Sequence, residues 1–155
     1  MCLATAVESP DRVLEKGEFA DHEFIITHNY AGGRCGYVKV EPGHPWHGVN
    51  YDSLQSVLVH GGLTFSQPDI ACEAEGSDNG WWLGFDFAHF GRDAADPTLP
   101  MTDEGRRHAK AINEAEAMLP SSNYMLKSWT HDEVRGQCRL VCKQAQNASI
   151  NALVR

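Results

Sequence analysis

Apolar and polar residues follow two periods along the chain, one typical of strands and one typical of helices. Residues 23–29 and 36–40 are rich in β-branched and aromatic side chains, and residues 31–34 (AGGR) between them carry turn glycines. This pattern predicts a β-hairpin. Residues 81–88 (WWLGFDFA) predict another strand, whose alternation assigns opposite faces to its odd and even positions. The expected core face holds Trp81, Leu83, Phe85 and Phe87, and the other face holds Trp82, Gly84, Asp86 and Ala88.

Two other segments are assigned less directly. Residues 56–66 (SVLVHGGLTFS) are predicted to form a buried strand interrupted at His60-Gly61-Gly62, because glycines inside a strand pattern indicate a bulge or a close backbone approach. Residues 1–22 are mixed and polar, and are predicted to form an extended lead-in with one short helix near residues 11–17.

Helical patterns follow the strands. Residues 102–119 begin with Thr102 as the predicted N-cap and with acidic residues in the first turn. Residues 130–152 begin with a capping box, TxxE, and carry one apolar stripe at spacings of four and three. The stripe predicts that this helix packs on the sheet and consists of Val134, Cys138, Val141, Ala145, Ala148 and Ala152.

Strands followed by helices favour an α+β fold. We expect a single domain over residues 1–155, with a small antiparallel sheet of about five strands in residues 23–90. Two helices follow, and the C-terminal one is expected to pack on the sheet. The length of 155 residues and an apolar content of 42% fit one globular core.

Charge and cysteine content narrow the functional classes. The net charge of −8 argues against general nucleic-acid binding, which needs a basic surface. No apolar run approaches the length of a membrane span, so we expect no membrane partner. Five cysteines without a CxxC spacing, and no visible signal peptide, favour a reduced cytoplasmic setting. The sequence is compatible with a homo-oligomer.

Three polar residues stand out in the strand patterns. His60 lies in an apolar run beside Gly61 and Gly62, which leave space for a ligand or another backbone. Asp86 lies in an aromatic strand, where a carboxylate needs solvent, a partner or a metal. His89 follows three residues later. We expect these residues to form one catalytic site, although a core histidine and a solvated aspartate are the structural alternatives.

The loop at residues 41–52 supplies further candidates. His44 and His47 are spaced by three, and Trp46 between them is an expected ligand contact, as are Gly61, Gly62 and Thr64. Histidines with a carboxylate would suit a divalent metal, with His60, Asp86 and His89 as its ligands. The alternatives are acid–base chemistry, with Asp86 orienting a histidine, and simple ligand binding.

Three strings carry a resemblance: GYVKVEPGHPWHG, VHGGLTFS and WWLGFDFAH. Over residues 36–93, and weakly in the last helix, the chain resembles an uncharacterised family encoded mainly by phages and prophages. The resemblance implies a joint role for three groups of residues. The three groups are Gly43, His44, Pro45 and Gly48; His60, Gly61, Gly62 and Thr64; and Gly84, Asp86 and His89.

The chain departs from the family pattern at one position. The pattern places an aspartate directly after the glycine of AHxG, where this chain has Arg92, with Asp93 one position later.

Two functions from different classes follow. One is a small phage-type hydrolase, with or without a divalent metal, that acts on a nucleotide or a similar phosphorylated small molecule. The other is a non-catalytic binder that sequesters a small ligand, such as a nucleotide signal, or blocks a host protein.

Overall fold

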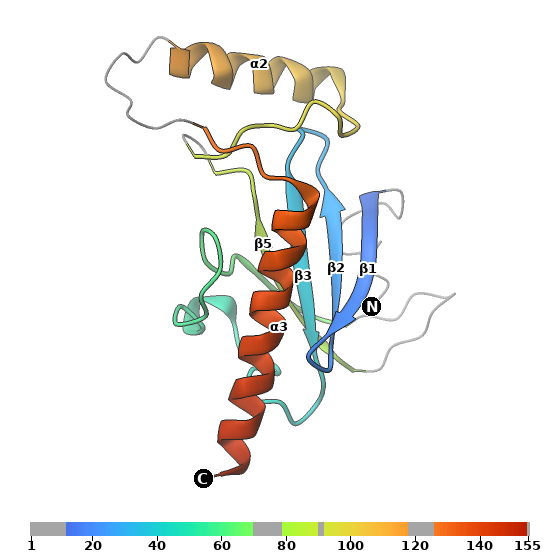
Figure 1. The fold of residues 1–155 in the computed structure, drawn as a ribbon, viewed down its shortest axis with the longest axis vertical. Helices are drawn as coiled ribbons and strands as arrows, with labels where there is room; N and C mark the ends of the chain where they lie inside the picture. Colours follow the sequence, from blue (N-terminus) through green and yellow to red (C-terminus); the bar gives the residue numbers. More distant parts are fainter. Residues whose placement is uncertain (1–11, 70–78, 90–91, 118–125, 155) are drawn as a thin grey trace.

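The structure is a computed structural model that describes residues 12–69, 79–89, 92–117 and 126–154. Five antiparallel strands form one sheet in the order β1-β2-β3-β5-β4, and two α-helices follow all of them in the chain (Figure 1). The expected α+β class with a five-stranded sheet is confirmed. The elements are β1 Val13–Phe19, β2 His22–His28, β3 Arg34–Val40, the 3₁₀ turn η2 Tyr51–Ser53, β4 Phe65–Pro68, β5 Trp81–Asp86, α2 Asp103–Ala117 and α3 His131–Leu153.

The sheet begins earlier than predicted. Residues 13–19 form the edge strand β1 instead of an extended lead-in with a short helix, and residues 1–11 lie outside the described part of the chain. A two-residue turn joins β1 to β2, with Ala20 and Asp21 both at positive φ, 48° and 67°. This geometry suits a tight hairpin because its twist matches that of the strands. The prediction failed because the turn contains no glycine.

Helix α3 covers one face of the sheet, as predicted (Figure 1). Its capping box is present: the Thr130 side chain accepts from the Glu133 N–H, and the Glu133 carboxylate accepts from the Thr130 N–H. The first four residues of the predicted stripe are fully buried, and Ala152 is exposed. On the sheet side, Leu83, Phe85 and Phe87 enter the same core, which confirms the predicted core face of β5.

Residues 54–64 do not form the predicted strand. They form turns, and the strand β4 begins only at Phe65. Gly61 and Gly62 have φ values of +71° and +77°, which are incompatible with an extended strand, and the Gly62 N–H donates to the Val59 carbonyl. Leu54, Val57 and Leu63 are still buried, so the apolar residues of this segment belong to a loop that covers the core.

The loop after β5 and the segment before α3 run side by side at one end of the sheet. Asp93 forms a parallel bridge with Lys127, and the Ala94 N–H donates to the Lys127 carbonyl at 2.9 Å. Helix α2 lies across the same end (Figure 1). Its predicted N-cap is confirmed, since the Thr102 hydroxyl accepts from the Gly105 N–H. Residues 118–119 of the predicted helix lie outside the described residues. No described helix is long and apolar enough to span a membrane.

Candidate functional site

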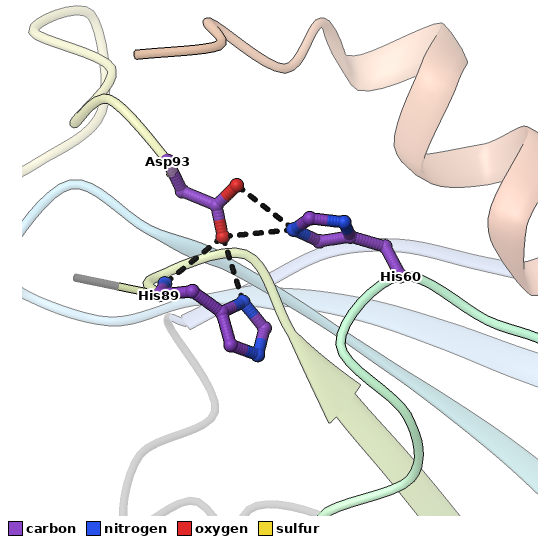
Figure 2. Close-up of side chains that lie close together, drawn as sticks. All are labelled: His60, His89 and Asp93. Atoms are coloured by element: carbon purple, nitrogen blue, oxygen red, sulfur yellow. Dashed lines mark hydrogen bonds and ion pairs between the residues drawn. The ribbon is translucent and has the colours of Figure 1, made fainter. Parts of the chain in front are cut away.

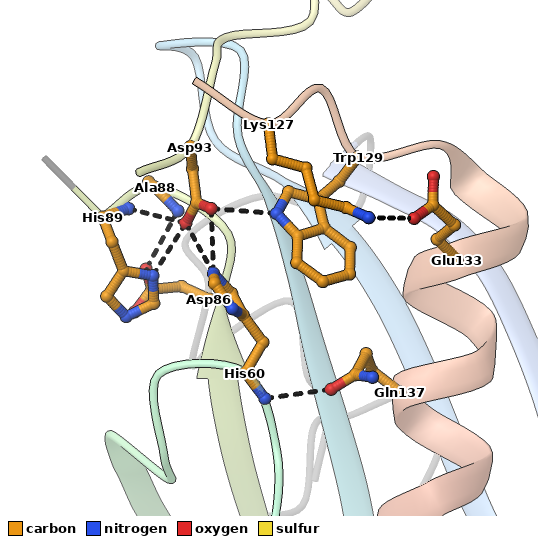
Figure 3. Close-up of polar contacts among 9 residues, drawn as sticks. All are labelled: His60, Asp86, Ala88, His89, Asp93, Lys127, Trp129, Glu133 and Gln137. Atoms are coloured by element: carbon orange, nitrogen blue, oxygen red, sulfur yellow. Dashed lines mark hydrogen bonds and ion pairs between the residues drawn. The ribbon is translucent and has the colours of Figure 1, made fainter. Parts of the chain in front are cut away.

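A buried carboxylate, Asp93, lies at the centre of the polar cluster. Its side chain is 0% exposed. Asp93 Oδ1 and Oδ2 lie 2.8 and 3.0 Å from His60 Nε2, and Oδ2 lies 2.8 Å from His89 Nδ1 (Figure 2). The His89 backbone N–H and the Trp129 indole N–H also donate to this carboxylate, at 2.9 Å each (Figure 3). Four donor groups from three separate chain segments therefore converge on one side chain.

These donors keep Asp93 ionised. Burial on its own raises the pKa of a carboxyl group, but the hydrogen bonds from the His89 backbone, the two imidazoles and the Trp129 indole outweigh it. The pKa of Asp93 is therefore held below its ordinary value of 3.8. Since an ionised carboxylate can only accept, the two imidazole nitrogens that face it carry protons.

His60 is positioned by helix α3 and by aromatic rings. Its backbone N–H donates to Gln137 Oε1 at 2.9 Å (Figure 3), and Gln144 binds both polar backbone groups of Leu58 in the same loop. The imidazole stacks on Phe87 with a 17° interplanar angle, and its centroid lies 4.5 Å from that of Trp129. The ring is thus held on two sides before any ligand binds.

His89 is positioned by Asp93 on one edge and by Gly61 on the other. A Cβ on Gly61 would lie closer than 3.0 Å to His89 Nε2 and Cε1. The space beside the glycine pair was predicted to admit a ligand or another backbone, and at Gly61 it is filled by the His89 ring. Gly62 differs, because a Cβ there would meet only Gln55 Oε1, at 3.9 Å.

Asp86 lies beside the cluster but binds elsewhere. Its Oδ1 is 3.8 Å from His89 Nδ1 and accepts from the Ala88 N–H, and its Oδ2 accepts from the Thr64 hydroxyl at 3.2 Å. The structure therefore brings His60 and His89 together as expected, with Asp86 and Thr64 next to them. Asp93 holds the central place that the sequence suggested for Asp86.

The three candidates of the loop after β3 do not join this cluster. Val40 pairs with Trp81 and Cys35 pairs with Asp86, so the loop starts at the opposite end of β5, roughly 17 Å along the strand. His44 Nδ1 accepts from the Trp46 N–H, and its Nε2 donates to the Ala145 carbonyl at 2.8 Å. His47 Nε2 lies 2.7 Å from the Asn79 carbonyl oxygen, and Trp46 packs against the core. These contacts anchor the loop.

His44 is expected to contribute to stability and not to the site. Burial first, and then the nearby histidines, lower the pKa of His44 from 6.5. The folded chain therefore binds fewer protons here than the unfolded chain, so stability decreases as the pH falls below about 6.5. His44→Phe should lower the free energy of unfolding by about 2 kcal/mol, because the Trp46 N–H and the Ala145 carbonyl lose their partner. It should also remove this pH-dependent component.

Denaturant unfolding of both proteins at several pH values measures the effect. His47→Phe is the control, since the side-chain hydrogen bond of the half-buried His47 lies at an exposed position, and its effect should be smaller. Equal losses in the two variants, or an unchanged pH dependence in His44→Phe, would contradict the role of His44.

A cavity of about 300 Å³ adjoins the cluster. This size is at the lower end of small-molecule pockets. The wall is mostly apolar and rich in alanine, with polar groups supplied by the cluster and by α2. We call it the alanine cavity; it is lined by Ala31, Gly33, Phe87, Ala88, His89, Asp93, Ala94, Ala95, His108, Ala109 and Ile112.

The three side chains at the centre form a potential ligand set for a metal ion. One donor atom from each of His60, His89 and Asp93 lies within 4.8 Å of the others. Two imidazoles and one carboxylate are the ligands of several catalytic metal centres. Without a metal, the same residues are an aspartate orienting two imidazoles, which is an acid–base arrangement.

Sequence reasoning missed Trp129 and Gln137 and gave Asp93 a minor place. A signal existed for Trp129, which directly precedes the N-cap Thr130, where an apolar residue commonly packs against the first turns of its helix. Nothing in the local sequence indicates that Gln137, a half-buried residue of α3, binds the His60 backbone.

Comparison of the chain with protein-family models, with curated proteins and with solved structures found no match.

Proposed function

We propose that the protein is a small hydrolase with a divalent metal ion held by His60, His89 and Asp93. The observation that supports this most strongly is the convergence of two imidazole nitrogens on one fully buried carboxylate. A tetrahedral zinc ion with bonds of about 2.0–2.2 Å needs donor atoms roughly 3.3 Å apart. The donor atoms here lie within 4.8 Å of one another, so small shifts would suffice.

The surroundings of the three ligands also suit a metal centre. The Trp129 indole N–H and the His89 backbone N–H orient the Asp93 carboxylate, as outer hydrogen bonds commonly do for metal ligands. Asp86, 3.8 Å from His89 Nδ1, is available as a fourth ligand or as a base. Metal binding would displace the imidazole protons, so affinity should decrease at lower pH.

The alanine cavity would hold the substrate. His89 and Asp93 form part of its wall, which places a bound molecule next to the proposed metal. In hydrolysis, the oxygen of water forms a bond to the electrophilic atom of the substrate, and the leaving group departs with a proton. A metal lowers the pKa of bound water, and Asp86 could accept the released proton. We expect a nucleotide or a similar phosphorylated small molecule, in the host cytoplasm.

Metal binding is the first test. The purified chain of 155 residues should bind one equivalent of Zn²⁺ or Co²⁺, measured by elemental analysis and by the visible absorption of Co²⁺. His60→Ala should lose this metal, and His47→Ala, a histidine at the other end of the sheet, should keep it. A protein without stoichiometric metal after loading, or equal metal in both variants, would contradict the proposal.

Trp129→Phe provides a sharper variant, because it keeps the ring against His60 and Phe87 but removes the N–H that binds Asp93. Loss of such an outer hydrogen bond typically weakens metal affinity about 10–100-fold. Competition titration with a chelating dye measures this change. An unchanged affinity would show that the indole N–H does not support a metal ligand.

A panel of nucleotides and phosphate esters then tests turnover. Hydrolysis that depends on both the metal and Asp86 supports the proposed activity. Saturable binding to the alanine cavity without turnover would instead identify a protein that sequesters its ligand.

A further inference from the structure

A second, open cleft adjoins the alanine cavity, and Asp93 is not among the residues that line this cleft. Its volume is about 580 Å³, and Ala31 and His108 line both hollows. We call it the arginine cleft, after Arg12 and Arg107 in its wall, which also includes Tyr30 and Thr102. The alanine cavity itself has no arginine or lysine among its lining residues.

The cleft gathers positive charge on a chain whose net charge is −8. Among the described residues, Arg12 and Arg107 line it together with His108, against a single acidic residue, Glu104. A hollow lined by one sign of charge concentrates ions of the opposite sign. On this acidic protein, the cleft is therefore a local exception that would attract a small anion.

The two arginines of the cleft are not neutralised by carboxylates of the described chain. Among the residues that the structure describes, no carboxylate forms an ion pair with Arg12 or Arg107. The Arg12 guanidinium lies over the Tyr30 ring, 4.3 Å from its centroid, and its buried Nε has no hydrogen-bond partner in the part of the chain that the structure describes. A buried donor without an acceptor is unfavourable and calls for an ion or a water as its partner.

We infer that the arginine cleft is an anion subsite that binds a phosphate or a similar group of the ligand whose apolar part fills the alanine cavity. This inference rests on the proposed function for the role of the cavity, but the subsite itself depends only on the cleft. Arginine suits the task because its planar guanidinium donates paired hydrogen bonds to phosphate oxygens. The cavity and the cleft together would thus select an amphipathic anion, such as a nucleoside monophosphate.

Inorganic phosphate, AMP and adenosine are the probes, and ¹⁵N-resolved NMR titration of the full chain is the measurement. Phosphate and AMP should shift the amides of Ala31 and His108, and AMP should bind more tightly than adenosine. Arg107→Gln should weaken AMP binding about tenfold, since a hydrogen bond to a charged group is lost. Glu104→Gln should strengthen it about twofold, because the acidic residue of the cleft is removed.

Arg106→Gln is the matched control, with the same charge change at a neighbouring exposed residue outside the cleft. It should alter AMP affinity less than twofold, and adenosine affinity should be the same in all variants. Equal weakening by Arg106→Gln and Arg107→Gln, equal affinity for AMP and adenosine, or shifts confined to other residues would overturn the subsite. Zinc content measured on the same samples tests the metal centre separately, so either proposal can fail while the other stands.

Discussion

Gly61→Ala is expected to unfold more easily than the wild-type protein by about 3 kcal/mol and to lose the ordered position of His89. Two effects add. The backbone at Gly61 has a φ of +71°, where an L-residue costs roughly 1–2 kcal/mol. The new methyl group would also overlap His89 Nε2, so the ring must move and its bond to Asp93 must lengthen or break, at a further cost of about 1–3 kcal/mol.

Gly62→Ala separates these two effects. Gly62 has nearly the same backbone conformation, with a φ of +77°, but a Cβ there enters open space. It should therefore show the backbone cost alone, and metal affinity should be unchanged. Denaturant unfolding gives the stability of both variants, and the side-chain NMR signals of His89 report its position. Equal destabilisation, with the His89 signals unmoved in Gly61→Ala, would contradict the close contact of glycine and imidazole.

The elements that could be predicted from the sequence are those with a local signal. The capping box of α3, its apolar stripe as far as Ala145 and the alternation of β5 each follow from a spacing within one element, and each is confirmed. The edge strand β1 was not predicted, because its turn contains no glycine and because Glu15 and Lys16 resemble a polar lead-in. Glu15 in fact pairs with Arg135 of α3, which holds the pKa of Glu15 at about 2, and such a long-range contact leaves no local pattern.

The candidate site likewise contains residues with a local sequence signal and residues without one. His60 and His89 could be identified because each interrupts an apolar pattern, and the structure places them 4.9 Å apart, centroid to centroid. Asp93 lies in a polar loop where an aspartate is ordinary, and only the fold of that loop against Lys127 brings it inside. His44 and His47 stood out by their spacing in a loop and, for His44, by the resemblance, and hydrogen bonds within their own end of the sheet account for both.

Asp93→Asn is expected to have the largest effect of any single substitution in the cluster. The side chain accepts four hydrogen bonds, and an amide would present its NH₂ group to one or more of these donors. Removing one partner from a buried charged network typically costs about 3–5 kcal/mol, and we expect a loss near the lower limit. The metal affinity should be lost with it, because the only buried carboxylate of the set is gone.

The dependence on pH gives this prediction its specific test. Because the folded pKa of Asp93 is below its ordinary value of 3.8, the folded chain binds fewer protons than the unfolded chain in acid. The stabilisation is therefore present above about pH 4 and decreases as the pH falls towards the folded pKa. Unfolding free energies of Asp93→Asn should show a smaller acid-side slope than wild type. Asp86→Asn, whose carboxylate is 34% exposed, should lose little stability. If Asp93→Asn and Asp86→Asn lost the same free energy of unfolding, Asp93 would not be the residue that links His60 to His89 through hydrogen bonds.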